Sequence, residues 1–293
     1  MSAAALPNAR PAQPRARGLL ARLLCDPLGR LGLIMTVLIL LMAVFAGTLA
    51  PVDPFKQDIL GRLGGPSARH LLGTDQFGRD TLSRILYGYR ASLGVAVGAV
   101  TIALLIGGTL GILAAYLGGW FDRVVMRVMD VLLAFPVILL AIGIVAVLGP
   151  GPANTALAIG VVYIPTFARL LRAPALVLKA SEYVSAAQAL GASDGRVIFR
   201  HILPNIVAVL LIQTSLALST AILVEASLSF LGLGTRPPTP SLGLMLSEAR
   251  TFLTLQPWPA VFSGLAILIA SLGFNLLGDS LRDVLDPRLR GQE

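Results

Sequence analysis

The sequence has 293 residues, of which 56% are hydrophobic and 13% are charged, and its formal net charge is +8. This composition is too apolar for an ordinary soluble domain and indicates a polytopic membrane protein. The basic residues stand at the ends of apolar segments without interleaved aromatic residues, which argues against a nucleic-acid-binding surface, and the one cysteine, Cys25, excludes an intrachain disulfide.

The N-terminal segment, residues 1–28, is rich in Ala, Pro and Arg, and we expect a disordered cytoplasmic tail there rather than a signal peptide. The apolar segments that follow are long enough to cross a bilayer, which takes about 20 residues. They predict an all-α membrane protein with six transmembrane helices, at Leu31–Leu49, Ser92–Tyr116, Val131–Leu148, Asn154–Leu171, Ile206–Leu223 and Ala260–Leu277. The membrane domain then covers residues 29–280, and residues 281–293 form a cytoplasmic C-terminal tail.

The distribution of Lys and Arg orients the chain. If the N-terminus is cytoplasmic, most basic residues lie on the cytoplasmic side, as the positive-inside rule requires. The first outer loop is an exception, because it carries several arginines that its own aspartates can pair. We therefore expect both termini, and the loop between the fourth and fifth spans, in the cytoplasm.

The first outer loop contains the string LGTDQFGRDTLSRILYGYRASL, Leu72–Leu93. Its glycines permit tight turns, so we expect Asp75, Arg79 and Asp80 to satisfy one another through ion pairs and backbone hydrogen bonds. A contact with a docked protein and a calcium site are the alternatives, although the spacing does not match an EF-hand loop.

Small residues recur four positions apart in the second span, as Gly94-x3-Gly98 and Gly107-x3-Gly111. This spacing lets two helices approach closely. It predicts tight packing inside one bundle and does not by itself indicate a dimer.

Charged residues at the edges of the spans are candidates for a gate. Arg127 and Asp130 are three residues apart and share one helix face, so we expect an intrahelical ion pair, with a cytoplasmic gate as the alternative. Glu225 lies near the outer end of the fifth span, where an acid is costly. We expect it to form a structural pair within the bundle rather than to line a translocation path.

A polar block, EYVSAAQALGASDGRVIFRHILPN, separates the fourth and fifth spans. Tyr183, Ala187 and Leu190 fall on one face of a predicted helix. Gly191 ends that helix, and Pro204 allows the next one to start. The small, flat face suits insertion into a groove of a soluble partner, and the alternative is a helix that lies on the lipid surface.

Residues for catalysis are missing from the sequence. His70 and His201 are isolated, and no His, Cys, Asp and Glu cluster has zinc spacing. The phosphate loop G-x4-G-K-[ST] is absent, so the chain cannot cradle ATP in the standard way. We therefore expect no enzyme activity, no cofactor and no metal.

The polar block resembles the coupling loop, or EAA loop, of binding-protein-dependent ABC importers. Ala186, Ala187, Gly191, Leu203 and Pro204 stand at the positions of the family pattern. The chain departs from it where the family has Glu and Ile, and carries Ser185 and His201 there. The fuller string resembles the C-type permease subunit of dipeptide, oligopeptide and nickel importers, as do Leu72–Leu93 and ILVEASLSFLGLG, Ile222–Gly234.

This resemblance implies a type I ABC importer permease bundle of the MetI-like kind in the bacterial inner membrane. It implies as partners a homologous second permease subunit, two cytoplasmic ATPases that hydrolyse ATP and an extracytoplasmic solute-binding protein. The ATPase-docking residues would be Glu182, Tyr183, Ala186, Ala187, Leu190, Gly191, Ala192, Ser193 and Asp194.

The resemblance leaves the solute open among di- and oligopeptides, nickel chelates and glutathione, and we favour peptides. An ion-coupled secondary transporter and a non-transporting membrane scaffold are the alternatives from other classes.

Overall fold

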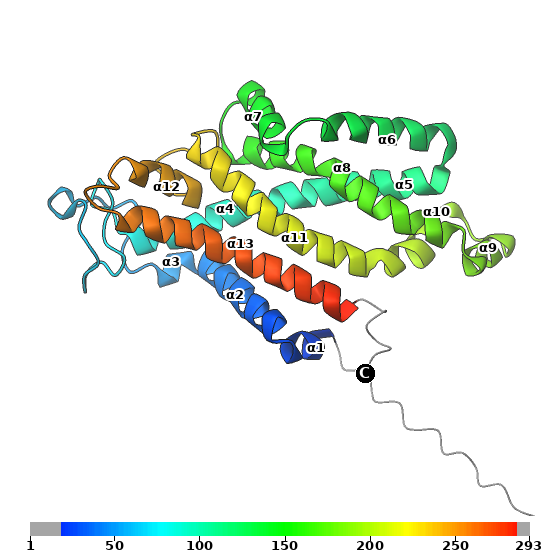
Figure 1. The fold of residues 1–293 in the computed structure, drawn as a ribbon, viewed down its shortest axis with the longest axis horizontal. Helices are drawn as coiled ribbons and strands as arrows, with labels where there is room; N and C mark the ends of the chain where they lie inside the picture. The colour runs from blue at the N-terminus through cyan, green and yellow to red at the C-terminus, as the bar shows by residue number, and fades with distance from the viewer. Residues whose placement is uncertain (1–18, 286–293) are drawn as a thin grey trace, which may run out of the picture.

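Long helices run side by side in the computed structural model, which describes residues 19–285 (Figure 1). Within residues 19–285, five helical segments are long and apolar enough to cross a membrane, and a sixth is obtained if the bent pair α6–α7 counts as one span. The all-α membrane fold is confirmed. The bundle has two ends, which we call the α9 end and the α12 end after the short helices that lie there (Figure 1).

The first span begins earlier than expected. Leu19–Cys25 form α1 and Pro27–Val44 form α2, so the disordered tail expected over 1–28 is wrong from Leu19 onward, and residues 1–18 lie outside the described residues. Asp26 caps α2, because its carboxylate accepts hydrogen bonds from the Ser280 hydroxyl and the Gly29 N–H, both at 2.8 Å. These bonds hold the pKa of Asp26 below its ordinary value. After a break at Phe45, Ala46–Leu49 form α3.

The second span is one helix from Thr81 to Leu117, formed by α4 (Thr81–Ala103), a π-helical turn (Leu104–Gly108) and α5 (Thr109–Leu117). It begins at Thr81 and not at Ser92, because Asp80 caps it by accepting a hydrogen bond of 2.8 Å from the Ser83 N–H. A short 3-10 helix, Ile59–Gly61, lies in the preceding loop.

The third span is not straight. α6 (Gly119–Leu133) and α7 (Val137–Leu148) meet at an angle of 93°. The straight span expected over Val131–Leu148 is therefore wrong. The cause is Pro136, which lacks an N–H and disfavours a helical conformation in the preceding residue, Phe135.

The remaining spans contain the predicted ranges and extend beyond them. α8 covers Pro152–Lys179, α11 covers Leu203–Phe230 and α13 covers Trp258–Leu285. Between α8 and α11 lie α9 (Glu182–Ala189), α10 (Asp194–Val197) and a π-helical turn, Ile198–Ile202. α12 (Leu242–Arg250) was not predicted, because it is short and lies between spans.

The glycines of the second span pack α5 and the π-helical turn against α8. A Cβ at Gly107 would stand 2.4 Å from the Ile164 carbonyl oxygen, and one at Gly111 would stand 2.2 Å from that of Ala168. Close packing is thus confirmed for this pair. It is wrong for Gly94, where a Cβ would meet nothing within 4 Å.

Candidate functional site

The polar block forms a short helix at the α9 end of the bundle (Figure 1). Val184 points inward and is fully buried, in a cluster with Val197, Ile202 and Leu171. In the same segment Leu190 is 90% exposed and Tyr183 is 45% exposed. Val184 therefore anchors α9 in the apolar interior, while Tyr183, Ala186 and Leu190 are exposed.

The backbone ends α9 at Gly191, as predicted. Gly191 has φ of +84°, a conformation that glycine adopts without strain. The Gly191 N–H donates to the Gln188 carbonyl at 2.9 Å, and the Ala192 N–H donates to the Ala187 carbonyl at 3.0 Å. These two bonds form a Schellman motif, which turns the chain sharply toward α10.

Tyr116 at the end of α5 ties α9 and α10 together. Its hydroxyl donates to the Asp194 carboxylate at 2.5 Å and accepts from the Gln188 side-chain amide at 3.3 Å. The backbone carbonyl of Tyr116 accepts from the Lys179 ammonium group. Sequence reasoning missed Tyr116 and Lys179, because both lie at the edges of apolar spans with no local signal.

The predicted docking residues mostly lie at the surface of this segment. Ala187 and Ala192 are half-buried, and the exposed ones are Glu182, Tyr183, Ala186, Leu190, Gly191, Ser193 and Asp194. Asp194 is already bonded to Tyr116, so its carboxylate holds α10 in place as well as facing outward.

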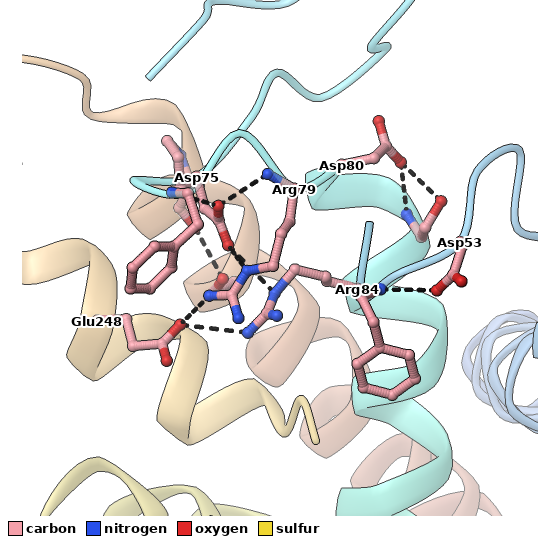
Figure 2. A network of polar contacts seen from close by, with 11 residues as sticks. Asp53, Asp75, Arg79, Asp80, Arg84 and Glu248 are labelled. Carbon is pink, nitrogen blue, oxygen red and sulfur yellow. Dashed lines mark hydrogen bonds and ion pairs between the residues drawn. The ribbon is translucent and has the colours of Figure 1, made fainter. Parts of the chain in front are cut away.

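At the α12 end, Asp75 and Arg79 form the expected pair (Figure 2). The Arg79 Nε donates to Asp75 Oδ2 at 2.6 Å, and the other carboxylate oxygen accepts the N–H groups of Phe77 and Arg79 at 2.9 Å each. The turn is therefore closed by its own side chains, as predicted.

Two residues that sequence reasoning missed extend this pair into a buried network (Figure 2). Glu248 on α12 accepts from Arg79 at 3.0 Å and from Arg84 on α4 at 3.2 Å. Arg84 also lies 3.4 Å from Asp75. The charges of two arginines and two carboxylates balance, and these side chains join the loop before α4, α4 itself and α12.

Asp80 lies beside this network and has different partners. Its carboxylate accepts from the Ser83 N–H at 2.8 Å and lies 2.9 Å from His70 Nδ1. The interpretation of His70 as isolated is therefore wrong. Within residues 19–285, no group of three or more His, Cys, Asp or Glu side chains could hold a metal ion.

Glu225 on α11 is fully buried. Its Oε1 accepts a hydrogen bond of 2.6 Å from the Ser229 hydroxyl, and its Oε2 has no hydrogen-bond partner in the described part of the chain. Its structural pairing is thus with a hydroxyl on the same helix and involves no basic side chain among residues 19–285.

On α6 the expected ion pair between Arg127 and Asp130 is wrong. Asp130 pairs with Arg169 on α8. One turn from the start of α6, Asp122 accepts two hydrogen bonds of 2.6 Å from Arg172, also on α8. Both acids of α6 therefore bind across to α8, because the two helices lie side by side (Figure 1).

Comparison with known proteins decides the family. The family model described as binding-protein-dependent transport system inner membrane component matches residues 107–291. The chain belongs to this family of transport permeases. The family model of the N-terminal TM domain of oligopeptide transport permease C matches residues 16–66, which agrees with the resemblance to C-type permeases.

Curated relatives cover most of this permease. It is 47% identical to the dipeptide transport system permease protein DppC of Alkalihalophilus pseudofirmus over 90% of this chain and 87% of that protein. It is 48% identical to the glutathione transport system permease protein GsiD of Pectobacterium atrosepticum over 87% of this chain and 85% of that protein. The permease is thus a subunit of a binding-protein-dependent ABC importer, which implies ATPase and binding-protein partners.

A solved structure shares the fold of this permease. A chain of the MetNI methionine ABC transporter, in an inward-facing conformation, matches with a TM-score of 0.56 and 17% identity. The match covers 69% of the permease and 97% of that chain. The expected type I importer bundle is confirmed by this likeness.

Proposed function

We propose that this chain is the membrane-spanning permease subunit of an ATP-driven importer of di- and oligopeptides. The 47% identity to a dipeptide permease over 90% of the chain carries this proposal. Glutathione is the second candidate solute, because a relative that is 48% identical bears its name. Both solutes are small peptides with carboxylate and amine groups, whereas nickel is named by neither of these relatives.

The proposed complex pairs this chain with a different, homologous permease chain, two cytoplasmic ATPases and an extracytoplasmic solute-binding protein. ATP hydrolysis takes place in the ATPases, since this sequence has no phosphate loop. Both termini and α9 face the cytoplasm, as the distribution of basic residues favours. The α12 end, with the network of Arg79, Arg84 and Glu248, then faces the docked binding protein.

In this proposal α9 is the coupling helix. The exposed face around Tyr183 and Leu190 inserts into a groove on an ATPase, and Val184 and Tyr116 transmit the movement to α5 and α11. ATP-driven closure of the ATPases pulls α9, the bundle opens toward the α12 end and accepts the solute, and hydrolysis resets it. The buried contacts of Val184 support this role, because a helix lying loosely on lipid would transmit no force.

The first experiment is purification of the tagged chain with its native partners and measurement of ATP hydrolysis in lipid discs with peptide-loaded binding protein. We expect co-purified ATPases and peptide-stimulated hydrolysis, both lost in Gly191→Asp, because the +84° φ at this position tolerates only glycine well. Gly195→Asp is the matched control, since a Cβ at Gly195 meets nothing within 4 Å.

The outcomes separate the alternatives. ATPases that co-purify without a peptide response would leave the permease role intact and redirect the search to glutathione. A secondary transporter would move peptide under an ion gradient without ATP, and a scaffold would move none with all partners present. Normal uptake by Gly191→Asp would contradict the lever role of α9.

A further inference from the structure

A broad groove lies along α6 and reaches Arg172 of α8. Its volume is about 670 Å³, within the range of about 300–1,000 Å³ that small-ligand sites occupy. Its polar lining consists of Asp122, Arg123, Arg127, Asp130 and Arg172, and the exposed indole of Trp120 stands beside them.

Arg127 is the charged residue of this groove that has no polar partner within residues 19–285. Asp122 is held by Arg172, and Asp130 is held by Arg169. The Nε of Arg123 donates to the Gly119 carbonyl at 3.3 Å. Arg127 has no hydrogen-bond or ion-pair partner among residues 19–285, and its side chain is exposed. Neither Arg123 nor Arg127 is neutralised by a carboxylate of the described chain, and Arg127 is the one of the two that has no polar partner there.

The charged stripe of α6 cannot face lipid. From Asp122 to Asp130 it extends about 12 Å, since a helix rises about 1.5 Å per residue. α6 runs alongside α8 and does not lie across the end of the bundle (Figure 1), so the stripe runs from the α9 end toward the middle of the bundle. Ionisable side chains at such depth face a water-filled cavity or another protein, and helices interrupted as α6 and α7 are at Pro136 commonly line such cavities.

We propose that this groove forms the α9-side section of the solute path and that Arg127 binds the carboxylate of the passing peptide. This inference rests on the proposed function, because it takes the solute to be a small peptide. Every unmodified peptide carries a C-terminal carboxylate, and a planar guanidinium can donate two parallel hydrogen bonds to it. The affinity of this site for the carboxylate is low, because the site is open to water, and it therefore releases the solute readily.

The test uses one reporter thiol in the assembled complex in lipid discs without ATP. Cys25→Ser removes the one native cysteine of this chain, and peptide uptake by sealed vesicles that carry this background is verified first. Val124→Cys then places a thiol in the groove, and Leu133→Cys places a control thiol on α6 outside the groove lining. The rate of modification by a charged, water-soluble thiol reagent is measured with increasing concentrations of a dipeptide and of its C-terminal amide.

We expect the reagent to modify the thiol at position 124 and the dipeptide to slow that reaction. The amide should require about tenfold higher concentration for the same slowing, as the loss of a charged hydrogen bond predicts. Arg127→Gln should raise the required dipeptide concentration by a similar factor, Arg127→Lys should restore part of the protection, and the thiol at position 133 should respond to neither peptide.

Three results would overturn the inference. A thiol at position 124 that the reagent cannot reach would mean that the partner permease covers the groove. Slowing by dipeptide and amide alike, or slowing unchanged by Arg127→Gln, would remove the role of the guanidinium. Peptide-stimulated ATP hydrolysis and peptide uptake are measured on the same background. If any of these three results occurs while uptake is normal, only the role of the groove is overturned. If no peptide is taken up at all, the proposed function is overturned.

Discussion

Arg84 of α4 and Glu248 of α12 are joined by a hydrogen bond of 3.2 Å, although 164 residues separate them along the chain. The same Glu248 oxygen accepts a bond of 3.0 Å from Arg79. The arginine side chains are 1% and 5% exposed, so both charges depend on this carboxylate and on Asp75 for compensation. The network fixes α12 and the loop before α4 to the second span.

Glu248→Gln should therefore destabilise the protein. The change keeps the shape of the side chain but leaves two buried guanidinium groups with one carboxylate, and we expect a loss of about 3 kcal/mol. Thermal unfolding of the detergent-purified chain measures it. Asp283→Asn is the matched control, because Asp283 is exposed on α13. Equal melting of the two variants would show that the network contributes little.

Glycine substitutions should distinguish the two small-residue motifs of the second span. Gly111→Ala places a methyl group 2.2 Å from the Ala168 carbonyl oxygen, so α5 must move away from α8 at a cost of about 1–3 kcal/mol. Gly94→Ala meets nothing within 4 Å and should stabilise its helix by up to about 1 kcal/mol. Thermal unfolding of both variants measures whether their changes in stability have opposite signs. Destabilisation by Gly94→Ala would mean that another chain packs against this glycine.

A comparison of Leu190→Ala with Val184→Ala should distinguish side chains that bind the ATPase from side chains that stabilise the fold. Leu190 is 90% exposed, so its truncation should leave the stability of the chain within about 0.5 kcal/mol of its original value. It should weaken association with the ATPase about tenfold, because an exposed apolar side chain is the kind that anchors an interface. Binding of purified ATPase to the permease in lipid discs, followed by fluorescence, measures this loss.

Val184→Ala should have the opposite pattern, with a loss of stability and little change in ATPase binding. The side chain is fully buried between α9 and its neighbours, and its truncation should cost about 2 kcal/mol of stability. ATPase binding measured below the unfolding transition should stay within twofold. Equal effects of Leu190→Ala and Val184→Ala on both measurements would contradict the division of α9 into an inner and an outer face.

Tyr116→Phe should loosen the attachment of α9 and α10 to α5. It removes the hydroxyl that bonds Asp194 at 2.5 Å and Gln188 at 3.3 Å, at a cost of about 1 kcal/mol in stability. Because α9 and α10 are then less firmly attached to α5, peptide uptake per ATP hydrolysed should fall while binding-protein-stimulated hydrolysis persists. Tyr87→Phe at the other end of the second span is the control, and an unchanged ratio of uptake to hydrolysis would exclude Tyr116 from force transmission.

Local sequence was enough to locate the apolar spans and the turn at the end of α9. Span positions depend on the composition of each local stretch, because every apolar segment partitions into lipid by its own residues. The end of α9 depends on one backbone conformation at Gly191, which is also a local property. The bend at Pro136 was equally local, and its Phe-Pro signal could have been used.

Which charged groups pair depends on how the helices pack. Asp130 was within reach of Arg127 on its own helix, but Arg169 on α8 binds it instead, and that choice leaves Arg127 open. The pairs of His70 with Asp80 and of Glu248 with Arg79 likewise form because folding brings together segments that are separate in the sequence. The physical reason is that an ion pair forms over a few ångströms of space, and the packing of helices, rather than spacing along one helix, sets which side chains come that close.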